Sequence, residues 1–138
     1  MESLYKLKNA EILRAVECDN LTSKLCESVW CKIYAEGVGH FAVDVCYRSQ
    51  EADESEICEL FDSIKLACGS NRSVLIMGDF NYPDINWNML KADNNGYKFL
   101  KLVIDCYLEQ HVCLPTRVNN ILNLILTNEL LSRMVLVY

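Results

Sequence analysis

A carboxylate and an amide stand two residues apart where an apolar run of the sequence ends. The run, residues 74–77, is short and rich in β-branched side chains, which is typical of a buried strand, and Gly78 ends it. Asp79 and Asn81 follow, with Phe80 between them. Because side chains alternate along an extended backbone, we expect Asp79 and Asn81 on one side and Phe80 in the core. Rigid strand ends of this kind commonly carry polar chemistry, so the pair is a candidate site.

The composition predicts one globular domain covering residues 1–138. Apolar residues make up 51% of the chain and charged residues 23%, and no apolar run approaches the length of a membrane span. The net charge is −6. A protein that binds nucleic acid by itself usually carries a basic face, so this acidic balance counts against tight DNA binding by the chain alone.

The cysteines and the N-terminus indicate an intracellular protein, nuclear or cytoplasmic, that is not secreted. Residues 1–15 carry charges throughout and have no apolar core of a signal peptide. Eight cysteines are present, most of them inside apolar periodic segments and none in a CxxC pair. We therefore expect free thiols in a reducing compartment, with disulfides as the alternative that the even count leaves open.

Alternating strand and helix patterns predict a layered α/β fold. Strand patterns cover residues 12–18, 28–34, 41–47, 74–77 and 121–126, and a last one begins near 134. A helix is expected from Asp53, with Glu56 completing a capping box and Gly69 ending the helix. A second amphipathic helix is expected over 97–109. These strands and helices have to hold Asp79 and Asn81 in place at the end of the strand over 74–77.

The stretch GDFNYPDINW, residues 78–87, resembles the endonuclease/exonuclease/phosphatase superfamily, and specifically the endonuclease domain of LINE-type (non-LTR) retrotransposons. Further matching segments follow the same order along the chain: ESVWCKI (27–33), VCYRS (45–49), LFDSIKLAC (60–68), KFLKLVIDCYLEQHV (98–112), PTR (115–117) and NNILNLILTNE (119–129). The resemblance implies an α/β (α+β) fold, a two-sheet β-sandwich flanked by helices. It runs from about residue 13, so the domain is expected to be incomplete at its N- and C-terminal ends.

The resemblance also implies roles for individual residues in hydrolysing a DNA phosphodiester. Asp79 matches the aspartate that orients or deprotonates the attacking water, and Asn81 the asparagine that bonds a phosphate oxygen. Tyr47 matches a tyrosine whose hydroxyl reaches the scissile phosphate. By the residues alone, Asp79 could equally cap a turn and Asn81 could equally satisfy backbone groups, and Tyr47 is better explained as a core aromatic.

Two further residues are candidate substrate contacts on the same grounds. Thr116 matches a segment that contacts the DNA backbone, and Arg48 follows Tyr47 at a position able to touch phosphate. The simpler interpretations are a loop residue after Pro115 for Thr116 and a solvated side chain for Arg48. At residue 50, glutamine replaces the proline of the family pattern.

Departures from the family pattern predict that the chain is inactive. Asn123 stands where the pattern has an aspartate that orients the catalytic histidine, and an amide carries no charge to stabilise an imidazolium. The metal-binding glutamate and the closing Ser-Asp-His motif have no counterpart in this sequence, and neither His40 nor His111 stands in such a motif. The principal Mg²⁺ site and the general acid/base are therefore expected to be missing.

The sequence thus predicts the remnant of a Mg²⁺-dependent DNA endonuclease, inactive in this chain and binding DNA weakly. The alternative is a non-catalytic module that kept the fold for protein contacts through exposed sheet edges. A third interpretation is a genomic relic that folds poorly.

Overall fold

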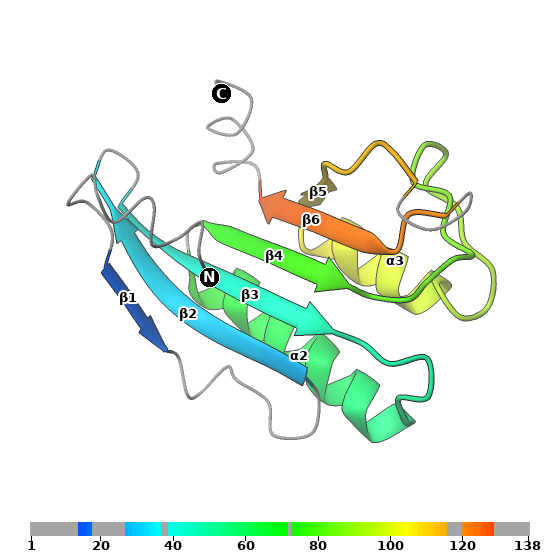
Figure 1. The fold of residues 1–138 in the computed structure, drawn as a ribbon, viewed down its shortest axis with the longest axis horizontal. Helices are drawn as coiled ribbons and strands as arrows, with labels where there is room; N and C mark the ends of the chain where they lie inside the picture. Colours follow the sequence, from blue (N-terminus) through cyan, green and yellow to red (C-terminus); the bar gives the residue numbers. More distant parts are fainter. Residues whose placement is uncertain (1–13, 18–26, 37–38, 72, 116–119, 129–138) are drawn as a thin grey trace.

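A single sheet organises the protein. The computed structural model describes residues 14–17, 27–36, 39–71, 73–115 and 120–128. Six strands are found there: β1 Arg14–Glu17, β2 Glu27–Ala35, β3 Gly39–Tyr47, β4 Val74–Asp79, β5 Leu108–Gln110 and β6 Asn123–Asn128. They form one sheet in the order β1-β2-β3-β4-β6-β5 (Figure 1). Every neighbouring pair is antiparallel except β3 and β4, which run parallel.

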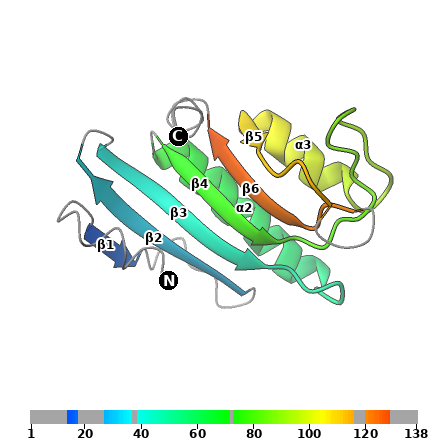
Figure 2. The same cartoon turned by 45° about the horizontal axis from the view of Figure 1, so that its top comes forward.

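Two helices cover one face of this sheet. Helix α2, Glu54–Ser70, crosses over from β3 to β4, and helix α3, Tyr97–Asp105, lies beside β5 and β6 on the same side (Figures 1 and 2). The layer between helices and sheet holds the core. Its fully buried members include Trp30, Leu60, Ile64, Ile76, Phe80, Phe99 and Leu126.

Helix α2 begins where the capping pattern predicts. Oδ1 of Asp53 accepts a hydrogen bond from the backbone N–H of Glu56 at 2.9 Å, which satisfies one of the unpaired donors of the first turn. The helix ends one residue past Gly69, at Ser70, and Asn71 closes it. Both the backbone N–H and the side-chain amide of Asn71 donate to the Ala67 carbonyl. The predicted helix is thus confirmed, with an asparagine cap at its end.

Helix α3 is shorter than the predicted 97–109, and this part of the prediction is wrong. Its last residue is Asp105, and Tyr107 takes a φ of 55°, a left-handed conformation that cannot continue a helix. The chain then turns into the short edge strand β5, which pairs with β6. Apolar periodicity cannot distinguish a last helical turn from a short strand, and pairing with β6 decides for the strand.

The α/β class is confirmed, whereas the second sheet of the expected sandwich is not found among the described residues. The predicted strand near 134 lies outside them, and every described strand joins the one sheet. The face opposite the helices consequently shows apolar side chains, with Val29 46%, Val45 54% and Ile125 39% exposed. We call this the open face.

The described part of the chain bears on two further expectations. No helix within it is long and apolar enough to cross a membrane. Its cysteines, at positions 31, 46, 58, 68, 106 and 113, are all free thiols, as the sequence predicts. Cys68, at the end of α2, and Cys106, just after α3, hydrogen-bond to each other, and burial raises the pKa of Cys68 to about 12.

Candidate active site

Four strands bring one polar side chain each to a common row at the end of the sheet. Glu27 of β2 pairs with Tyr47 of β3. Tyr47 pairs in turn with Asp79 of β4, and Asp79 with Asn123 of β6. Side chains at directly paired positions lie on the same face, with neighbouring Cβ atoms about 5 Å apart. We call these four residues the polar rung.

The polar rung belongs to the open face of the sheet. The next position on each strand, where Ser28, Cys46, Gly78 and Leu124 pair, points to the helix-covered face. Glu27 and Asn123 are exposed, Tyr47 is 46% exposed and Asp79 is half-buried. The register places Tyr47 beside Asp79, and the alternative of a core aromatic does not hold for Tyr47.

Asp79 and Asn81 are in contact, but not through two side chains on the same side of an extended strand, as the sequence predicts. The backbone N–H of Asn81 donates to Oδ1 of Asp79 at 3.0 Å. Asn81 has a φ of 52°, so the extended backbone assumed from the sequence ends at Phe80. As a result the Asn81 side chain is buried, and its Nδ2 donates to the Arg48 carbonyl at 2.7 Å.

Gly78 is required for this strand end by close backbone contact. Its φ is 150°, and a Cβ placed there would lie 1.8 Å from the carbonyl oxygen of Cys46 on β3. Any side chain would push β3 and β4 apart one residue before Asp79. The glycine therefore lets Tyr47 and Asp79 sit side by side on neighbouring strands.

Arg48 is neither the exposed phosphate contact that the resemblance implies nor the solvated side chain that was the simpler interpretation. It is 9% exposed, and its guanidinium donates to backbone carbonyls of the loop that follows β4. The group also lies over the ring of Tyr82, 3.8 Å from the centroid. The donors expected to face phosphate are thus directed at the protein's own backbone.

Both histidines of the chain lie away from the polar rung. His111 donates its backbone N–H to Ile125, two residues along β6 from Asn123, and its Nε2 contacts the Thr127 hydroxyl, farther away still. His111 thus lies directly after strand β5 and not at the end of a helix. His40 lies at the opposite end of β3 from Tyr47, paired with Tyr34. Neither imidazole can serve as an acid or base at Asp79.

By themselves, the residues of the polar rung offer few ligands for a divalent cation. No group of three or more carboxylate, imidazole or thiolate side chains able to hold a metal occurs within the described ranges. Asp79 is flanked on the rung by a phenol and an amide, and one of its oxygens already accepts the Asn81 N–H. Oxygen-rich Mg²⁺ sites usually need further carboxylates or phosphate.

Thr116 lies outside the described residues, so its DNA contact stays a prediction.

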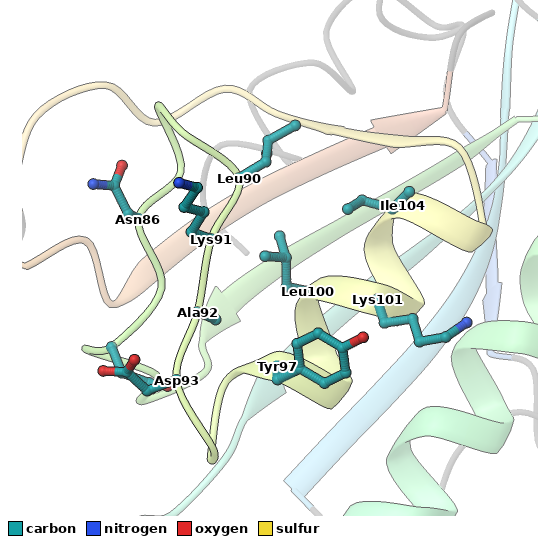
Figure 3. Close-up of a pocket in the computed structure, with 10 residues that line it drawn as sticks. Asn86, Leu90, Lys91, Ala92, Asp93, Tyr97, Leu100, Lys101 and Ile104 are labelled. Atoms are coloured by element: carbon teal, nitrogen blue, oxygen red, sulfur yellow. The ribbon is translucent and has the colours of Figure 1, made fainter.

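Two cavities lie near the strand ends, and a third is separate from them. Glu27 and Tyr47 line a cavity of about 200 Å³ together with Arg48. A larger one of about 600 Å³ is bordered by Arg48, Asn81 and Lys98. A more apolar groove of about 540 Å³ lies between the loop carrying Asn86, Leu90 and Lys91 and helix α3 (Figure 3). None of the polar-rung residues lines this groove, so it is not the candidate site.

Glu27 is the rung member that the sequence did not single out. It is the first residue of the segment ESVWCKI, whose match to the family pattern assigns no role to this glutamate. Its place beside Tyr47 depends on the β2–β3 register, a long-range pairing that periodicity does not set.

Fold and site together define an α/β domain with a carboxylate, a phenol and an amide joined at the ends of its central strands. The chain belongs to the endonuclease-reverse transcriptase family, whose pattern matches residues 41–137. This confirms the resemblance found in the sequence, and the family is a nuclease type that typically uses a metal.

One solved structure supports the fold. The endonuclease domain of TRAS1, a telomere-specific non-LTR retrotransposon, superposes with a TM-score of 0.62 at 15% identity. The match covers 85% of this chain and 54% of that one, so the chain spans about half of the solved domain's length. At this identity the likeness speaks for the fold alone. No curated protein matches the sequence.

Proposed function

We propose that this chain is a retrotransposon-type endonuclease domain that keeps the phosphate-facing polar rung but does not hydrolyse DNA by itself. The observation that carries the proposal is the register that aligns Tyr47, Asp79 and Asn123 on one row. By family role, Tyr47 contacts the phosphate and Asp79 orients the attacking water. The Asn81 side chain is buried and its amide donates to the Arg48 carbonyl, so in this chain we assign Asn81 to holding the loop and not to the phosphate. Thr116 contacts the DNA backbone.

The proposed lack of turnover rests on what surrounds Asp79. Hydrolysis needs an activated water, charge stabilisation at phosphorus and a proton for the leaving group. Asn123 carries no charge, and an aspartate-to-asparagine change in a comparable triad lowers the rate by about four orders of magnitude. The two histidines of the chain are placed elsewhere, at His40 and His111. Mg²⁺ dependence belongs to the proposed ancestral activity, and no step in this chain is assigned to the ion.

A plasmid-nicking assay with Mg²⁺ tests this proposal. We expect the wild type to convert no more supercoiled plasmid than Asp79→Ala, because neither His40 nor His111 lies where it could act as an acid or base at position 79. Asn123→Asp is expected to stay inactive as well, since restoring the carboxylate supplies no imidazole. Nicking by the wild type that Asp79→Ala abolishes would show that the inference of inactivity is wrong.

The second candidate function is a non-catalytic protein-binding module, and the open face favours it. Val29, Val45 and Ile125 lie in one row across the sheet, with half-buried Met77 of β4 between Val45 and Ile125, and together they expose apolar area that soluble monomers usually avoid. The edge strand β1 offers a further place for a partner strand. A monomer in light scattering that binds duplex DNA and captures no protein would remove this candidate.

A further inference from the structure

Arg48 makes contacts that join the ends of β3 and β4. It directly follows Tyr47, the last residue of β3. Its Nε donates to the Phe80 carbonyl and its Nη2 to the Asn81 carbonyl, each at 2.6 Å. Its Nη1 donates to the neighbouring Ser49 carbonyl at 3.3 Å. One guanidinium therefore binds two consecutive peptide groups of the segment that carries the site.

The same segment returns contacts to the Arg48 backbone. The side-chain amide of Asn81 donates to the Arg48 carbonyl at 2.7 Å, and the Arg48 N–H donates to the Asp79 carbonyl at 2.8 Å. The Asn81 N–H in turn donates to the Asp79 carboxylate. Arg48 and Asn81 thus hold each other through both main chain and side chain, an arrangement that we call the clasp.

Tyr82 anchors the clasp to the core. Its ring lies under the Arg48 guanidinium on one side and stacks on Phe99, with 5.0 Å between ring centroids. Phe99 is fully buried, and Tyr82 is 4% exposed. A desolvated guanidinium over an aromatic face gains attraction that a hydrated one does not. The clasp is therefore fixed both to the strand ends and to the helix layer.

We propose that Arg48 is a positioning residue of the site: it holds Asn81 in its left-handed conformation, sets the Asp79 carboxylate, and contacts no phosphate itself. Asparagine adopts a φ of 52° more readily than other non-glycine residues, but the conformation is still uncommon and is stabilised by contacts that fix it. The planar fork of arginine supplies donors in several fixed directions, whereas the ammonium of lysine is a single point charge. Arginine and lysine are thus not interchangeable here.

Hydrogen exchange tests the clasp without DNA. In Arg48→Lys we expect amide exchange of Phe80, Asn81 and Tyr82 to rise about tenfold or more, while protection in α2 and α3 stays as in the wild type. The matched control is Lys98→Gln, which removes one exposed charge from the wall of the cavity of about 600 Å³ that Arg48 and Asn81 also line. It should leave the exchange unchanged. Unchanged exchange in Arg48→Lys, or a uniform rise across the domain, would overturn the proposal.

The salt dependence of DNA binding separates positioning from phosphate contact, and this arm rests on the proposed function. We expect Arg48→Lys to weaken binding as much as Arg48→Ala, with the slope of log Kd against log salt unchanged. A phosphate contact would instead let Arg48→Lys keep most of the affinity and make Arg48→Ala lower the slope by about one. If the wild type binds no DNA at all, the proposed function fails, and the exchange result still decides on the clasp.

Discussion

Asp44 places a carboxyl group on the helix-covered face of β3, fully buried and paired in register with Trp30. Oδ1 accepts a hydrogen bond from the Ser28 hydroxyl at 2.7 Å, and Oδ2 has no hydrogen-bond partner among the described residues. Burial raises the pKa of Asp44 from 3.8 to about 7, against the opposing effect of the Ser28 bond. The folded protein therefore binds a proton at neutral pH that the unfolded chain releases.

This proton makes stability fall as the pH rises. Between about 4 and 7 the folded state holds more protons than the unfolded state, so the free energy of unfolding decreases by an amount on the order of 4 kcal/mol and is level above that window. We expect Asp44→Asn to remove this fall and to be more stable than the wild type at pH 8. Urea melts across the pH range measure it.

The control for this prediction is Asp62→Asn, which removes an exposed carboxylate from α2. It should follow the wild-type dependence on pH. An Asp44→Asn variant whose stability changes with pH just as the wild type does would show that the buried carboxyl is not the source.

At the scale of elements, the end of α3 decides how β5 reaches the sheet. Tyr107 is 85% exposed, and its φ of 55° is a conformation in which glycine is the usual residue. Its N–H bonds to Ile104, and Leu108 next to it already pairs with β6. The tyrosine ring contributes little to the core, while its Cβ strains the turn.

We therefore expect Tyr107→Gly to raise the free energy of unfolding by about 1 kcal/mol, because the left-handed turn no longer strains a Cβ. Tyr107→Ala is the matched control, since it removes the ring and keeps the Cβ. Chemical denaturation of the two variants measures the difference. Equal stability of the glycine and alanine variants would mean that the turn stores no strain.

At the scale of the whole molecule, the two faces of the sheet differ in what covers them. Helices α2 and α3 cover one face (Figure 2). On the other face the side chains of Val29, Val45 and Ile125 remain exposed. Val43 lies two residues from Val45 on the same strand and the same face, yet it is only 4% exposed. Burial on the open face therefore changes sharply along β3.

This contrast predicts that the same substitution has different effects on stability at two nearby positions. Val45→Thr should change the free energy of unfolding by less than about 0.5 kcal/mol and should reduce self-association, because the side chain is exposed. Val43→Thr should lower stability by about 1–2 kcal/mol, because it buries a hydroxyl. Urea melts and concentration-dependent light scattering check both. Equal effects at the two positions would contradict the exposure difference.

Local patterns were sufficient for much of the fold. The apolar run before Gly78 predicted β4, the Asp53 cap predicted the start of α2, and alternation predicted β2 and β3, because each rests on contacts between near neighbours in the chain. The ten-residue match at 78–87 also pointed to Asp79, and the VCYRS match to Tyr47, which the register places side by side. Their roles toward DNA stay predictions.

The remainder depended on contacts between distant residues. Only the register of four strands places Glu27 and Asn123 in line with Tyr47 and Asp79, since a shift of one residue would turn a side chain to the opposite face. Only the packed loop shows that Arg48 holds the backbone of Phe80 and Asn81, more than 30 positions away. The sequence by itself predicted which groups could meet phosphate. The tertiary structure decided which of these side chains face solvent and which hydrogen-bond to neighbouring segments of the protein. Hydrogen bonds between distant segments produce no periodic pattern in the sequence, so the sequence alone could not show this.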